Sequence, residues 1–213
     1  MEDVLDLYQE DYDPLRPVVC FDEVPYQLVG ETRLPVAPQR GRRRRVDYEY
    51  RRCGTVNLFM LVEPLVGWRH VDVTNQRTNR DFAHQMRDLV DLHYADAAMV
   101  RVVLDNLSTH SGAALYETFA PEEARRILRK LEFHYTPKHG SWLNMAEIEI
   151  SVMGRQCLNR RIDSAPAVQA AIRTWQATRN DQGAQIQWRF TVSDARKKMH
   201  RIYSSRPPWW RTS

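Results

Sequence analysis

Short apolar runs separated by turn-forming residues mark the first part of the chain, a pattern typical of β-strands. Three segments have this character: Pro17–Asp22, Cys53–Glu63 and Gly67–Thr74. Pro64 and Gly67 separate the second segment from the third, which suits a turn between antiparallel neighbours. The pattern predicts a meander of three strands whose first strand ends at Asp22. Between the first two strands, residues 24–45 are rich in proline and arginine and predict a long connection or an extended hairpin.

Helical spacing begins after the third strand. Asn79 and Asp81 introduce the first predicted helix, Phe82–His93. Its apolar side chains fall on one helical face, which should cover one side of the sheet: Phe82, Met86, Leu89 and Val90.

The remaining elements alternate strands with helices. Ala98–Leu104 has the composition of a buried strand and ends at Asp105. Further elements are expected as follows: helices at Gly112–Phe119 and Pro121–Leu131, a strand at Glu132–Tyr135, a loop at Thr136–Trp142, and helices at about Leu143–Asn159 and Ala165–Arg179. This order predicts an α/β fold with a mixed sheet.

The length of 213 residues and the hydrophobic content of 43% support one substantial core. We expect an acidic lead-in at residues 1–16, one domain over residues 17–203 with a basic loop or hairpin insertion at 24–52, and a tail at 204–213. No apolar run approaches the roughly 20 residues that span a bilayer, and the acidic start lacks the features of a signal peptide. We therefore expect a cytoplasmic protein with no membrane partner.

Charge is unevenly distributed along the chain. The net charge is +4, yet residues 1–15 contain six acidic side chains and no Lys or Arg, so the rest of the chain is more strongly basic. Arginine supplies most of this charge and suits bidentate contacts with phosphate, although a GC-rich genome would produce the same bias. The three cysteines are widely spaced, which indicates reduced structural thiols rather than disulfides or a zinc site.

Three acidic residues occupy informative positions. Asp22 and Asp105 each end a predicted strand, and Glu147 lies in the first part of the long predicted helix. Carboxylates are hard oxygen ligands that suit Mg²⁺ or Mn²⁺, and two such ions about 3.5–4 Å apart support phosphoryl transfer. Each residue also has a structural interpretation: Asp22 as a strand-end acid paired with an arginine, and Asp105 as an Asx-turn cap beside Asn106.

The surrounding strings carry a family resemblance. CFDE, LDNLSTH and TPKHGSWLNMAEIE resemble bacterial transposases of the mariner superfamily, in the insertion-sequence 630 branch, from about Pro17 to Tyr203. The resemblance implies an RNase H-like fold with a mixed five-stranded sheet flanked by helices. It also implies that Asp22, Asp105 and Glu147 are the catalytic DDE residues and hold two Mg²⁺ ions, with Mn²⁺ as a substitute.

The resemblance further implies the reaction and its partners. These are hydrolysis of phosphodiesters at transposon ends, strand transfer into target DNA, double-stranded DNA as substrate, and a homodimer that pairs two ends in the bacterial nucleoid. Family members carry an amino-terminal helix-turn-helix region, whereas this chain starts shortly before Asp22, so we expect a separately encoded partner or a truncated product. The alternatives are an RNase H-fold nuclease or resolvase without strand transfer, and a non-catalytic DNA-binding remnant.

Glu149 is the local rival of Glu147. At about 100° per residue, the two side chains point roughly 200° apart, so only one can serve the site. Glu147 shares its face with Ser151 and Gly154, which permit close approach. Glu149 shares its face with Gln156 and Arg160, which suggests a solvated surface, and Asn144 is a candidate helix cap.

Residues around the three acids are candidates for supporting roles. Asn106 is expected to orient a carboxylate or water, and His110 to approach the phosphate or leaving oxygen, unless both serve only as loop residues. Lys138 and His139 are expected phosphate contacts or, alternatively, exposed loop charges without a specific role, and Trp142 either stacks on DNA or fills the core. The most basic segment is an expected DNA contact or, alternatively, a solvated hairpin, and it contains Arg40, Arg42, Arg43, Arg44, Arg45, Arg51 and Arg52.

Overall fold

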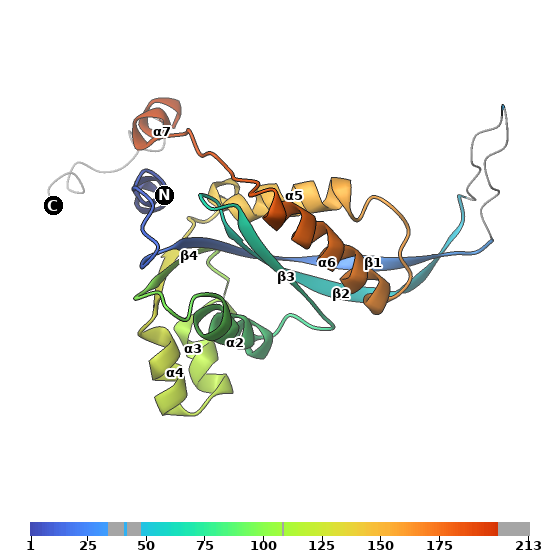
Figure 1. Ribbon diagram of the computed structural model, residues 1–213, viewed down its shortest axis with the longest axis horizontal. Helices are drawn as coiled ribbons and strands as arrows, with labels where there is room; N and C mark the ends of the chain where they lie inside the picture. Colours follow the sequence, from blue (N-terminus) through green and yellow to red (C-terminus); the bar gives the residue numbers. More distant parts are fainter. Residues whose placement is uncertain (34–40, 42–47, 108, 200–213) are drawn as a thin grey trace, which may run out of the picture.

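A computed structural model describes residues 1–33, 41, 48–107 and 109–199 (Figure 1). Its centre is one five-stranded sheet in the order β3-β2-β1-β4-β5. The strands are β1 (Val18–Glu31), β2 (Tyr50–Glu63), β3 (Trp68–Thr74), β4 (Val100–Leu104) and β5 (Leu131–Tyr135). β1, β2 and β3 are antiparallel neighbours, whereas β1–β4 and β4–β5 are parallel, which confirms the predicted mixed sheet.

The first two strands form a hairpin much longer than the apolar runs alone predicted. Their register extends from Cys20 opposite Val62 to Glu31 opposite Tyr50, with an irregularity between Leu28 and Val29. The extended-hairpin alternative is therefore confirmed for the described part of this region. Five of the arginines expected to contact DNA lie outside the described residues: Arg40, Arg42, Arg43, Arg44 and Arg45.

Helices cover both faces of the sheet (Figure 1). On one face lie α2 (Asn79–Asp88), its continuation as a π-helix η1 (Leu89–His93), α3 (Gly112–Thr118) and α4 (Pro121–Leu128). The other face carries α5 (Met145–Gln156) and α6 (Ala165–Asp181), with a short 3-10 turn η2 (Ser141–Leu143) before α5. α2 begins at Asn79, three residues before the predicted start at Phe82, because Thr78 and Asp81 form a reciprocal capping box.

Two short helices were not predicted. α1 (Glu2–Leu7) lies in the acidic lead-in and α7 (Val192–Lys198) follows α6. Val4 and Leu5 of α1 are fully buried in the core cluster on the α5 face of the sheet, and α1 contacts β5 and α7, so the lead-in is packed into the domain. Helices of six or seven residues are too short to show a clear helical period, because they hold fewer than two full turns.

Alternation along β1 divides the core into two layers. Val18 and Cys20 pack in the cluster that contains α5 and α6, whereas Val19 and Phe21 pack in the cluster that contains α2, α3 and α4. Successive side chains of a strand point to opposite faces of the sheet. This alternation places Asp22 on the α5 face and Glu23 on the α2 face. Within the described part of the chain, no helix has the length and apolar character to cross a membrane.

Candidate active site

Asp22 and Asp105 come from neighbouring parallel strands. β1 pairs with β4 so that Val18 lies opposite Arg101 and Cys20 opposite Val103. The same offset places Asp22 beside Asp105, directly after the last residue of β4. Asp22 has the parity of Cys20, so its carboxylate points to the face that α5 covers.

Glu147 is brought to this face by the start of α5. The Asn144 side chain accepts a hydrogen bond from the Ala146 N–H at 3.1 Å, and its amide donates to the Phe21 carbonyl at 2.7 Å. Through these two bonds Asn144, which is fully buried, caps α5 and fastens it to β1 at the residue before Asp22. The predicted capping role of Asn144 is confirmed, and Glu147 lies in the first turn that this cap begins.

The three carboxylates interact electrostatically. The pKa of Asp22 is raised to about 7, chiefly by burial and further by the negative charges of Asp105, Glu147 and Glu23. A hydrogen bond from the Glu23 N–H to Asp22 Oδ1, 2.8 Å long, acts in the opposite direction. Asp22 is thus a carboxylate whose ionised form lacks sufficient positive compensation from the protein.

His110 lies beneath Asp105 and is almost completely buried, with 1% of its surface exposed. Its Nδ1 is 2.5 Å from Asp105 Oδ1, and its Nε2 is 2.7 Å from Glu23 Oε2. Burial lowers the pKa of His110, but the two carboxylates outweigh it and raise the value to about 9. Both ring nitrogens are therefore protonated at neutral pH. His110 is buried and holds Asp105, whereas its sequence position had suggested that it approaches the phosphate or leaving oxygen.

Glu23 was missed by the sequence analysis. Its side chain is 5% exposed and lies against His110, on the side of the sheet opposite to Asp22. The parity of Val19 and Phe21 on β1 would have placed Glu23 in the interior, so the signal was present in the strand pattern. Asn106, expected to orient a carboxylate, is exposed, and among the described residues its side chain has no hydrogen-bond partner.

Glu149 is not on a solvated face, which corrects the sequence-based expectation. It is fully buried: Oε1 lies 2.8 Å from Arg69 Nε and 2.6 Å from Arg179 Nε, and Oε2 accepts from Arg179 Nη2 at 3.1 Å. Arg69 is also fully buried and donates to Asn180 Oδ1 and to the Ala184 carbonyl. Glu149 therefore joins α5 to β3 and α6 and is excluded from the candidate site by its partners.

The expected DNA-contacting residues within the described chain are exposed. Lys138 and His139 lie in the loop before η2, and Arg51 and Arg52 lie on β2 near the hairpin end. Trp142 is 39% exposed. It stacks on Trp188 with ring centroids 6.2 Å apart and meets Phe190 edge-on at 5.5 Å, so it is neither a core residue nor a free surface ring.

The three acids are of the ligand type that divalent cations prefer. They supply only hard oxygen donors, and their mutual repulsion, seen in the raised pKa of Asp22, is what a cation would relieve. In the described residues, however, no three His, Cys, Asp or Glu side chains already stand together at metal-binding spacing. One oxygen of Asp105 contacts His110, which leaves its other oxygen available to coordinate a cation.

The fold is similar to solved structures of the Mos1 mariner transposase. The Mos1 strand transfer complex matches with a TM-score of 0.57 and 15% identity, over 85% of this chain and 54% of that chain. The Mos1 paired-end complex with left transposon end matches with a TM-score of 0.55 and 15% identity, over 86% and 57%. The catalytic domain of Mos1 matches with a TM-score of 0.55 and 14% identity, over 85% and 81%.

These likenesses confirm the predicted RNase H-like fold. The chain spans about half the length of the Mos1 chains in the two complexes. No curated protein matches the sequence. The sequence does match the family described as DDE superfamily endonuclease over residues 17–169, well over half of the chain, and the protein therefore belongs to this family.

Proposed function

We propose that this protein is the catalytic domain of a DNA transposase that cuts phosphodiester bonds at transposon ends and joins the freed strands to target DNA. Membership of the DDE endonuclease family and the similarity of the fold to the Mos1 catalytic domain support this proposal. The observation that carries it is that Asp22 and Asp105 lie side by side on neighbouring strands, on the face that α5 covers, while the charge of Glu147 in the first turn of α5 contributes to the raised pKa of Asp22.

In this proposal, Asp22, Asp105 and Glu147 would hold two Mg²⁺ ions, and the chemistry that such ions would supply is activation of the attacking oxygen and stabilisation of the leaving oxygen. The protein's own contribution is positioning. His110 fixes the orientation of Asp105 through a 2.5 Å contact, and Glu23 keeps the imidazole charged from the other side. Asn144 fixes the start of α5, so that Glu147 stays opposite the two aspartates. Rigid placement of this kind lowers the entropic part of the barrier.

Exposed basic side chains at two places would contact DNA phosphates. Lys138 and His139 precede α5, whereas Arg51 and Arg52 lie farther from the site, on the hairpin opposite Gly30 and Val29. We further propose that two copies pair two transposon ends, because the similar Mos1 structure is a paired-end complex. Assignment to the insertion-sequence 630 branch rests on the strings around Asp22, Asp105 and Glu147.

The test is a cleavage and joining assay with labelled transposon-end DNA, a target plasmid and Mg²⁺ or Mn²⁺. We expect Asp105→Asn to abolish nicking while salt-sensitive DNA binding stays nearly intact, because the substitution removes a metal ligand and not a phosphate contact. Asp96→Asn is the matched control, since Asp96 is an exposed acid in the loop before β4. Cleavage at the wild-type rate by Asp105→Asn would refute the site.

The same assay separates two activities. A nuclease of the RNase H fold would cut the labelled ends and release products without joining them. A transposase would transfer the labelled strand to the plasmid, which appears as a slower-migrating product. Tight binding without cleavage would favour a non-catalytic remnant.

A further inference from the structure

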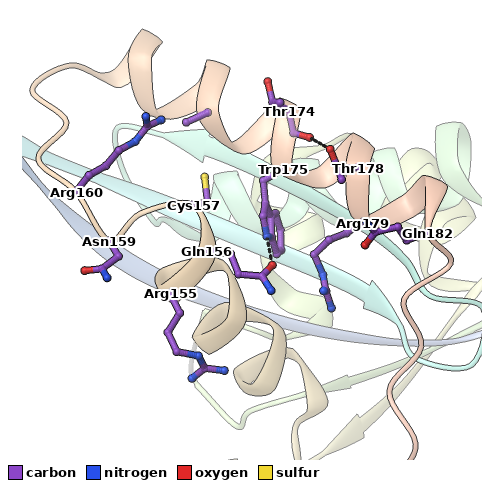
Figure 2. A pocket seen from close by; sticks show the side chains of 11 residues that line it. Arg155, Gln156, Cys157, Asn159, Arg160, Thr174, Trp175, Thr178, Arg179 and Gln182 are labelled. Atoms are coloured by element: carbon purple, nitrogen blue, oxygen red, sulfur yellow. Dashed lines mark hydrogen bonds between the residues drawn. The ribbon is translucent and has the colours of Figure 1, made fainter.

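A polar groove lies between the carboxyl-terminal end of α5 and the side of α6 that carries Trp175 and Arg179 (Figure 2). Its volume is about 650 Å³, and it is distinct from the candidate active site, which lies at the opposite end of α5. Arg155 and Arg160 line its α5 side, and Arg179 reaches toward α5 from α6. No Asp or Glu is found among the described residues that line it.

Two of these arginines have uncompensated charges. Arg155 and Arg160 are exposed, and within the described chain neither has a carboxylate partner. Arg155 donates only to the Ser151 hydroxyl, at 2.5 Å. Arg179 is different, because Glu149 neutralises it and fixes its position. The groove therefore combines a fixed arginine with two exposed ones that are available to an anion.

The neutral groups of the groove also present donors. The Gln156 side-chain oxygen accepts a hydrogen bond from Trp175 Nε1 at 3.0 Å, as Figure 2 shows. This bond uses the acceptor of Gln156 and leaves its NH₂ group as the free donor. Guanidinium and amide donors without acids among the lining residues favour a ligand rich in acceptor oxygens. Because these side chains are exposed, they suit a nucleic-acid backbone that passes along the surface better than an enclosed small molecule.

The groove is continuous with the candidate site along one helix. Eight residues separate Glu147 from Arg155, which corresponds to about 12 Å along the helix axis. Ser151, to which Arg155 donates, lies about 40° from Glu147 around the helix, so the guanidinium leans toward the catalytic face. At Gly154, an added Cβ would meet no atom of the described residues within 4 Å, so the helix surface is open at this position. At 3.4 Å per base pair, DNA held at the acids reaches the groove after about four base pairs.

We infer that the groove between α5 and α6 binds the phosphodiester backbone of duplex DNA that extends from the candidate active site. Arg155 and Arg160 neutralise phosphates, and Gln156 donates to a phosphate oxygen. This inference rests on the proposed function, because it extends the path of the DNA substrate, but DNA binding can be measured without cleavage.

The experiment compares Arg155→Gln/Arg160→Gln with a control that removes the same charge elsewhere. Arg125→Gln/Arg129→Gln is matched, because both residues are exposed, lack carboxylate partners among the described residues and belong to α4 and its carboxyl-terminal cap, on the opposite face of the sheet. Binding of each protein to a fluorescent random-sequence duplex is measured in EDTA between about 0.05 and 0.2 M NaCl. Circular dichroism confirms that each variant is folded.

We expect the groove variant to bind roughly tenfold more weakly at the low-salt end and its salt slope to fall by about two, while the control stays within about twofold of wild type. Thr178→Glu, which adds a carboxylate to the groove wall and removes only the hydrogen bond from Thr178 Oγ1 to the Thr174 carbonyl, should also weaken binding. Equal weakening by the groove variant and the control, or no weakening by either groove substitution, overturns the inference alone. A wild-type protein that does not bind DNA overturns the proposed function as well.

Discussion

Two glutamates, two residues apart on α5, have opposite surroundings. Glu149 is fully buried and lies between Arg69 and Arg179, each within 2.8 Å of one of its oxygens. Glu147 is only partly buried, and the charges with which it interacts are those of other carboxylates, as the raised pKa of Asp22 records. One acid is neutralised by the fold, and the other adds to an unneutralised negative cluster.

The difference separates a structural charge from a functional one. A buried ion is tolerable only when paired, so Glu149 and its arginines must remain together for the fold to survive. A cluster of like charges instead lowers stability, and a fold retains it only where a ligand compensates it. In the proposed function, Glu147 and Asp22 belong to a cation-dependent site, whereas Glu149 braces α5 against β3 and α6.

Glu147→Gln gives the largest expected effect. We expect Mg²⁺-dependent nicking to fall at least about 10³-fold, an increase of ~4 kcal/mol in the barrier, because the amide cannot replace an anionic metal ligand. The free energy of unfolding should change little, since the side chain is partly exposed and makes no ion pair in the described chain. Single-turnover cleavage and urea denaturation measure the two effects. Cleavage within tenfold of wild type would remove Glu147 from the site.

Glu149→Gln should reverse this outcome. It leaves the fully buried Arg69 without its anionic partner, and breaking a buried pair from one side costs about 3 kcal/mol or more in stability. The urea midpoint should therefore fall, while the fraction that stays folded should still cleave DNA. Glu147→Gln serves as the control, because it is the same chemical change two residues away. A loss of cleavage larger than the loss of folded protein would contradict the division between the two glutamates.

The pH dependence of stability should reveal the negative cluster. The pKa of Asp22 is about 7 in the fold against 3.8 for the ordinary group, so the folded state binds more protons between these values and loses stability as pH rises through this window. We expect Asp22→Asn to be more stable than wild type at pH 8, on the order of 2 kcal/mol or roughly 4–8 °C in Tm, after allowing for partial exposure.

At pH 4 the advantage of Asp22→Asn should largely disappear, because the wild-type carboxyl is then mostly protonated. Thermal unfolding in EDTA at both pH values measures the difference. Added Mg²⁺ should stabilise the wild type and not Asp22→Asn. Equal melting temperatures of the two proteins at pH 8 would show that the cluster does not strain the fold.

Patterns along single elements predicted much of this molecule. The mixed sheet, the placement of Asp105 directly after β4, and the cap at Asn144 all depend on local periods and turn chemistry, whereas the predicted strand end at Asp22 was wrong, because β1 continues to Glu31. The partners of Glu149 could not be predicted in this way. Arg69 lies on β3 and Arg179 on α6, so their contact with Glu149 depends on tertiary packing, which the helical period of α5 cannot reveal.

The role of His110 illustrates the same limit. Its place in the LDNLSTH string suggested a role at the site, but the burial that makes it a support for Asp105 comes from Phe21 and Phe82, which pack against its ring from other elements. Glu23 is intermediate, because β1 alternation places it inside but does not identify its partner. Sequence therefore located the acids better than it located the groups that hold them.

Asn144→Ala gives the smallest expected effect and affects both glutamates together. It removes the cap of α5 and leaves the Phe21 carbonyl without the Asn144 amide, which should cost ~1–2 kcal/mol in stability. Because the buried ion pairs of Glu149 still hold α5 against β3 and α6, the helix should remain in place and only its first turn should loosen.

Cleavage by Asn144→Ala should then fall moderately, by roughly 10-fold, since Glu147 lies in that turn. Asn144→Asp, which keeps the capping oxygen but not the amide, should recover the cap and only part of the activity. If Asn144→Ala lowered stability without any effect on cleavage, the tie between Asn144 and β1 would be structural only, and the placement of Glu147 would have to depend on Glu149 and its arginines.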